Sequence, residues 1–152
     1  MKSTRSTANW IHVIFLCIAI VLMLVGQTMA IFNYDWTVSV GLQEDPDKVG
    51  EAIKQVNRAF GAGDTIVYTP LLALSLAGLW LRRRWALIAT AAAAGASLYW
   101  TATVSFAFWF LPGTPGYSHT PPPEVWVFIA VFFIFGFWSL GYLLSRGDRL
   151  LK

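Results

Sequence analysis

Four long apolar stretches alternate along the chain with shorter polar segments. The apolar stretches cover residues 10–31, 65–81, 85–111 and 125–144. An α-helix rises about 1.5 Å per residue, so stretches of this length cross a hydrocarbon core of roughly 30 Å. The pattern predicts an all-α membrane protein whose four transmembrane helices form an antiparallel bundle.

The loop between the first two stretches, residues 32–64, carries patterns of its own. Apolar residues at 34, 36, 38, 40 and 42 alternate with polar or small ones, which predicts a short outer strand with one buried face. Further on, Asp45 can cap a helix that begins at Pro46 and shows apolar residues at helical spacing, namely Val49, Ile53, Val56 and Phe60. The loop is therefore expected to hold a strand and a separate amphipathic outer helix, which ends before the second span.

Composition supports one membrane domain over residues 1–152. Hydrophobic residues make up 57% of the 152 residues and charged residues only 12%. The segments between the spans are too short to fold as a second domain. We expect membrane lipids to surround the protein in a bacterial inner membrane or a plasma membrane.

The charges predict an orientation in that membrane. Most of the 11 lysines and arginines lie before the first span, between the second and third, or after the fourth. Most acidic residues lie in the other two loops, among them Asp35, Asp64 and Glu124. The positive-inside rule then places both termini in the cytoplasm. Because this rule accounts for the net charge of +3, no nucleic-acid partner is expected.

Several function classes are disfavoured by residues that the chain lacks. Cys17 is the only cysteine, which excludes an intramolecular disulfide, a multi-thiolate metal site and the paired-cysteine chemistry of quinone-linked thiol oxidases. The central parts of the four spans carry no Asp, Glu, Lys or Arg, which disfavours a proton-coupled exporter. We expect no cofactor and assign no catalytic residue.

Small hydroxyl-bearing residues recur on one face of the third span. Thr90, Ser97, Thr101 and Ser105 fall at helical spacing together with Ala94. Such residues let neighbouring helices approach closely, and their hydroxyls can also line a solute path. Helix packing is the favoured interpretation.

Aromatic residues mark candidate partner-facing surfaces. They surround much of the fourth span, so some must face lipid, a bound apolar molecule or another protein. The candidates there are Trp126, Phe128, Phe132, Phe133 and Phe135, and on the predicted outer strand they are Trp36, Val38 and Val40. An unpaired strand needs a partner for its backbone, so pairing between two subunits is one hypothesis.

The two histidines and two of the carboxylates are weaker candidates for a functional site. His119, Asp64 and Glu124 are expected near the outer surface, where they are weak candidates for a metal site, although helix capping and the helix dipole already account for the carboxylates. His12 is expected at the inner membrane interface, bonded to water or a lipid headgroup.

Three functions follow from these features. The leading hypothesis is a non-enzymatic membrane protein that acts as an accessory or scaffold subunit of a membrane complex or as a self-assembling oligomer. The alternatives are a small channel or carrier for a neutral or apolar solute, and a lipid-modifying enzyme at the outer surface.

Overall fold

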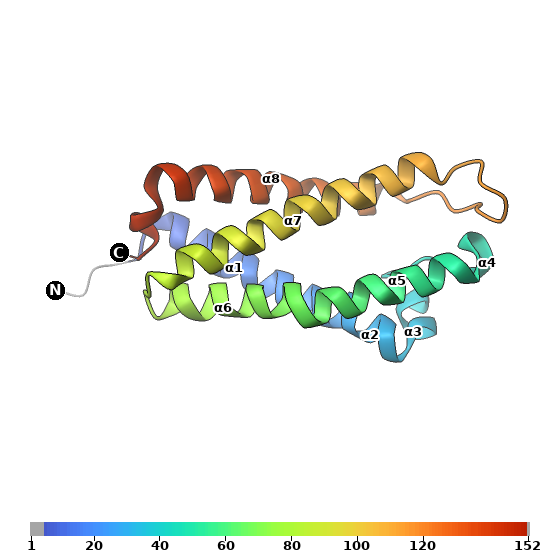
Figure 1. Cartoon of the computed structure of the whole chain (residues 1–152), viewed down its shortest axis with the longest axis horizontal. Coiled ribbons are helices and arrows are strands. Elements are labelled where there is room, and N and C mark those ends of the chain that lie inside the picture. The colour runs from blue at the N-terminus through green and yellow to red at the C-terminus, as the bar shows by residue number, and fades with distance from the viewer. Residues whose placement is uncertain (1–4, 152) are drawn as a thin grey trace.

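All regular elements of the protein are helical in the computed structural model, which describes residues 5–151. Four helical segments are long and apolar enough to cross a membrane. The first is α1 (Thr7–Leu22), η1 (Met23–Thr28) and α2 (Met29–Phe32), and the second is α5 (Glu51–Gly63), η2 (Asp64–Tyr68) and α6 (Thr69–Trp80). The third is α7 (Trp85–Phe110), and the fourth is α8 (Pro123–Arg146) with η3 (Gly147–Leu151) (Figure 1). The predicted membrane helices are thus present.

The long helices pack in chain order. α1 contacts α6, α6 contacts α7, and α7 contacts α8. The rings of Phe15 on α1 and Phe135 on α8 stack with centroids 3.5 Å apart, so the first and last helices also meet. We call the end with the first turn of α1, residues 81–84 and η3 the arginine end, and the opposite end, with α2–α4 and residues 111–122, the loop end (Figure 1).

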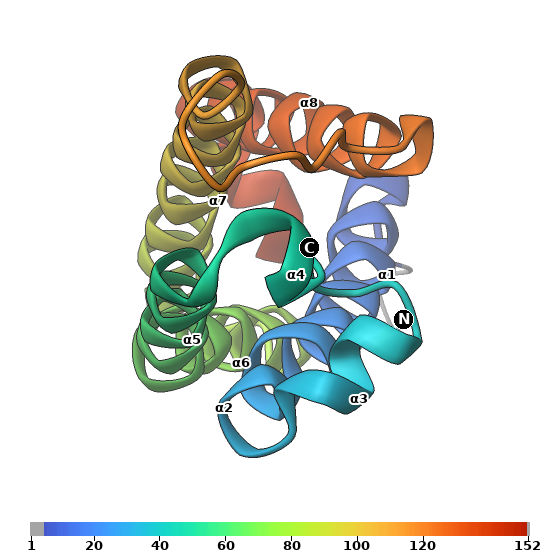
Figure 2. The same cartoon turned by 90° about the vertical axis from the view of Figure 1, so that its right-hand side faces the viewer.

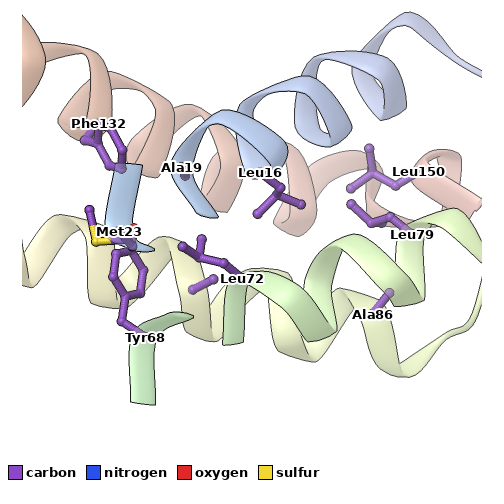
Figure 3. Close-up of a cluster of buried hydrophobic side chains, with 10 residues drawn as sticks. Leu16, Ala19, Met23, Tyr68, Leu72, Leu79, Ala86, Phe132 and Leu150 are labelled. Atoms are coloured by element: carbon purple, nitrogen blue, oxygen red, sulfur yellow. The ribbon is translucent and has the colours of Figure 1, made fainter. Parts of the chain in front are cut away.

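A hydrophobic core runs from the arginine end to the middle of the molecule. Leu79, Ala86 and Leu150 lie at one extreme of the core, and Met23, Tyr68 and Phe132 lie at the other (Figure 3). Leu16 and Leu72 fill the space between them. The core therefore joins all four long helical segments.

Glycine and alanine bring the helices close together around α7. A Cβ atom on Gly78 of α6 would lie 2.6 Å from Ala86 Cβ, and one on Gly136 of α8 would lie 3.2 Å from the Ala94 carbonyl oxygen. Backbones in membranes approach this closely only where side chains are small. The small-residue face of α7 thus contacts both neighbouring helices.

The predicted outer strand is wrong, because residues Tyr34–Ser39 form a helix, α3, and no strand occurs in residues 5–151. Asn33 caps its start by accepting a hydrogen bond from Trp36 N–H at 3.1 Å. At its end, Leu42 N–H donates to the Thr37 carbonyl and Gly41 N–H to the Val38 carbonyl, with Gly41 at φ 75°. This is a Schellman motif. The helix satisfies locally the backbone groups that a lone strand would leave unpaired.

The amphipathic outer helix exists, but it is not separate from the second span. Asp45 and Pro46 begin only the short helix α4 (Pro46–Val49), which ends at Gly50 with φ 82°. A second helix, α5, starts at Glu51 and continues through η2 into α6. The expected end before the second span is therefore wrong, since the helix continues through Gly61 and Gly63. Gly61 instead lets α5 approach the backbone of η1 closely, since a Cβ atom at Gly61 would lie 2.6 Å from the Gln27 carbonyl oxygen.

Candidate functional site

The short helix α3 is held at the loop end by its buried side. Tyr34 and Thr37 are buried, and the Tyr34 hydroxyl donates to the Glu44 carbonyl at 3.1 Å. Asn57 of α5 donates to the Tyr34 hydroxyl at 3.1 Å and to the Glu44 carboxylate at 2.6 Å. Burial raises the pKa of the Tyr34 phenol above its ordinary value, so it remains a protonated donor near neutral pH. The network fixes α3 to the start of the second long helix.

The other side of α3 and the turn after it present apolar side chains outside the four helical segments that are long and apolar enough to cross a membrane. Trp36 and Val40, one helical turn apart, are 38% and 49% exposed, and Leu42 is 40% exposed. Val38, also predicted to face a partner, is half-buried. We call Trp36, Val40 and Leu42 the α3 patch. Most other exposed apolar residues lie on the four helical segments that are long and apolar enough to cross a membrane, but this patch belongs to a connecting segment.

The loop between α7 and α8 folds across the loop end and reaches α4. Ser118 N–H donates to the Lys48 carbonyl at 2.7 Å. Figure 2 views the molecule from this end, with α4 between α5 and α1 and the 111–122 loop passing above it. The short helix α4 is therefore bonded to the loop that joins the third and fourth long helical segments.

Two π-helical turns meet where the first and second long helices cross. η1 lies against η2, and the hydroxyls of Thr28 and Thr65 are 2.8 Å apart. π-Turns insert an extra residue into a helix and are frequent at functional sites. Asp64 lies inside the continuous helix rather than at its cap, so the capping interpretation is wrong. Its Oδ2 atom is buried and has no hydrogen-bond partner among the described residues.

The hydroxyl residues of α7 lie mostly in the protein interior. Thr90, Ser97 and Thr101 are buried, whereas Ser105 is half-buried. Ser97 donates to the Ala93 carbonyl, Thr101 to the Ser97 carbonyl and Ser105 to the Thr101 carbonyl, at 2.9, 2.9 and 2.7 Å. Tyr68 of η2 also bonds to Ser97. Three of the four hydroxyls are thus bonded within their own helix.

The aromatic residues of α8 divide between two environments. Phe132 is buried in the core, while Phe128 and Phe135 are partly buried against Trp100 and Phe15. Trp126 and Phe133 are exposed, at 44% and 40%. Of the five predicted partner-facing residues on α8, only Trp126 and Phe133 are therefore exposed.

His12 is fully buried, so the expectation of an interfacial histidine is wrong. Its Nδ1 lies 2.8 Å from the Ala8 carbonyl oxygen, which can only accept, and therefore Nδ1 carries the hydrogen. Nε2 then accepts from the Ser139 hydroxyl of α8 at 3.0 Å. Asn9, also buried, donates to the Leu150 carbonyl at 2.6 Å. The spacing of three between Asn9 and His12 puts both residues on one helix face, although it does not indicate which segments they contact.

The weak metal candidates do not form a cluster. Within residues 5–151, no group of three His, Cys, Asp or Glu side chains could hold a metal ion. The His119 ring lies 6.3 Å from the rings of both Phe108 and Tyr117, and Glu124 lies in the first turn of α8.

Comparisons of the chain with protein-family models, with curated proteins and with solved structures each find no match.

Proposed function

We propose that this chain is a non-enzymatic integral membrane protein that works by association, as an accessory or scaffold subunit or as a self-assembling oligomer. The observation that carries the proposal is the α3 patch, an apolar surface outside the membrane-crossing helices. An apolar surface on a connecting segment gains free energy when a partner covers it. The hydrogen bonds of Tyr34 and Asn57 hold the patch in place, which lowers the entropic cost of binding.

The packed interior supports association over solute transport. Leu16, Leu72 and Phe132 fill the space between the helices, and the hydroxyls of Ser97 and Thr101 bond to carbonyls of their own helix. A solute path would need these hydroxyls free to contact the solute. We therefore assign the hydroxyl face of α7 to helix packing, within an antiparallel four-helix bundle.

The proposed orientation places both termini and residues 82–84 in the cytoplasm and the α3 patch outside. Thiol labelling of intact cells tests it in a Cys17→Ser background. Glu44→Cys should react with a membrane-impermeant maleimide, and Arg83→Cys should react only after lysis. Labelling of both positions in intact cells would contradict this topology.

Association itself is tested by native mass spectrometry after extraction in a mild detergent. The full chain should appear with a partner or as an oligomer, and the double variant Trp36→Ala/Val40→Ala should shift it to the single subunit. Trp109→Ala is the matched control, because Trp109 is 78% exposed on a membrane-crossing helix. This control should leave the assembly intact. A wild-type chain that is monomeric in every mild detergent would overturn the proposal.

A further inference from the structure

A hollow of about 380 Å³ lies at the arginine end, between the beginning of α7 and the end of α8 with η3. Its wall includes Leu87, Leu143 and Leu144, and its polar lining includes Arg146, Asp148 and Arg149. Leu144 is 90% exposed, so the apolar side of the hollow opens towards the space that lipid chains would occupy. The lining thus combines leucine side chains on one side with two arginines at the opening.

The two arginines are available to a ligand. The side chains of Arg146 and Arg149 are exposed and make no hydrogen bond or ion pair with any of residues 5–151. A guanidinium group donates to phosphate in a planar, often bidentate arrangement. Two such groups beside an apolar wall match a molecule that carries a phosphate on an acyl chain.

The backbone beneath the arginines is anchored to the first helix. Asn9 donates to the Leu150 carbonyl at 2.6 Å, and Ser6 donates to the Arg149 carbonyl at 3.2 Å. Leu150 is fully buried in the core. The turn that carries Arg149 is therefore positioned before a ligand arrives, so little order has to be gained on binding.

Aromatic residues place the hollow at the depth of the lipid headgroups. Trp10, Trp80 and Trp85 lie at the same end and are 45%, 52% and 43% exposed. Tryptophan is enriched at the membrane–water interface. Arg5 packs over the Trp80 ring at 4.0 Å, as expected for a cation at this depth.

We propose that this hollow binds the phosphate group of an anionic phospholipid, with Arg146 and Arg149 at the headgroup and an acyl chain along Leu143 and Leu144. Basic pockets between membrane helices recognise such headgroups. Asp148 in the same lining repels the phosphate, so it limits the affinity. This proposal is independent of the α3 patch and of the partner that the patch would bind.

The test is lipid retention by the full chain in native mass spectrometry, with phosphatidylglycerol and phosphatidylcholine supplied in equal amounts. The wild-type chain should retain phosphatidylglycerol preferentially. Arg146→Gln/Arg149→Gln should lower this preference about tenfold or more, and Asp148→Asn should raise it. Circular dichroism should show unchanged helix content in each variant.

The matched control is Arg83→Gln/Arg84→Gln, which removes the same charge at the same end. An equal loss of preference in this control would assign the effect to general surface charge and overturn the proposal. Unchanged retention in Arg146→Gln/Arg149→Gln would overturn it as well. A further arm adds inorganic phosphate, and displacement of the lipid at millimolar phosphate would identify a site for the free anion instead.

Discussion

The two ends of the molecule are held together in different ways, although the same long helices run through both. Towards the arginine end, the core residues Leu79, Ala86 and Leu150 pack between helices. Towards the loop end, α7 has no buried residue from Ala102 to Phe110, and α8 has none from Pro123 to Phe128. Aromatic pairs such as Phe108 and Trp126, with centroids 5.7 Å apart, join the helices there. Core packing thus holds the long helices together at the arginine end. At the loop end, ring contacts and hydrogen bonds hold the structure together, among them the side-chain bonds of Tyr34 and Asn57.

The difference implies that one end determines most of the stability, while the other end presents an exposed apolar surface. Buried side chains contribute most of the packing free energy, so the arginine end and the middle should dominate resistance to unfolding. The loop end contains exposed apolar residues such as Trp36 and Val40, and these residues do not belong to the core. Substitutions at the two ends should therefore affect different measurements.

Removing core volume should have the largest effect. Leu79 is fully buried, so Leu79→Ala should lower the free energy of unfolding by about 2–5 kcal/mol. Leu74→Ala on the same helix is the control, because Leu74 is 51% exposed and should lose less than about 0.5 kcal/mol. Reversible unfolding in mixed lipid–detergent micelles measures both. Equal losses would contradict the proposed distribution of stability.

Overpacking the helix crossing should have an intermediate effect. Gly61→Ala puts a Cβ atom 2.6 Å from the Gln27 carbonyl oxygen, and a backbone atom cannot move aside easily. A cost of about 1–3 kcal/mol is expected in the same unfolding assay.

Gly63→Ala is the matched control for this crossing. Gly63 has helical angles, with φ −59° and ψ −45°, and nothing lies within 4 Å of a Cβ atom there. Alanine should therefore be neutral or stabilising by about 0.5–1 kcal/mol. A destabilised Gly63→Ala variant would show that the crossing tolerates no change at either glycine and would remove the role assigned to Gly61.

Removing a buried hydrogen bond should have the smallest effect. Ser139→Ala leaves His12 Nε2 without its donor, and interhelical bonds in membranes contribute about 0.6 kcal/mol on average and up to about 1.7. Ser145→Ala is the control, since Ser145 is exposed and bonds to the Gly141 carbonyl of its own helix. A loss in Ser139→Ala no greater than in Ser145→Ala would contradict a stabilising role for this bond.

Long apolar stretches could be predicted from the sequence because hydropathy alone defines them. The predicted spans 10–31 and 85–111 nearly coincide with the helices Thr7–Phe32 and Trp85–Phe110, and the predicted span 125–144 lies within Pro123–Leu151. The α3 segment could not be predicted from alternation alone. Period two and helical spacing both fit so short a run, and Asn33 and Gly41, which cap the helix, carried the deciding information.

The burial of His12 and the π-helical turns depend on contacts between distant segments. His12 faces Ser139, which lies on the last helix, and η1 faces η2 across the loop. Local sequence does not encode which helices contact each other, so hydrophobic patterns and helix propensities cannot predict such contacts. The same limit applies to the hollow at the arginine end, whose lining comes from Leu87 and from residues 143–149.

The hydrogen bond from Ser118 to Lys48 has a consequence for biogenesis. A ribosome releases Lys48 well before Ser118, because the whole of α6 and α7 lies between these two residues. The loop that holds Ser118 is therefore synthesised late, and it binds a segment that was translated early. A chain that ends before Ser118 would lack this hydrogen bond, so α4 would not be joined to the loop between α7 and α8.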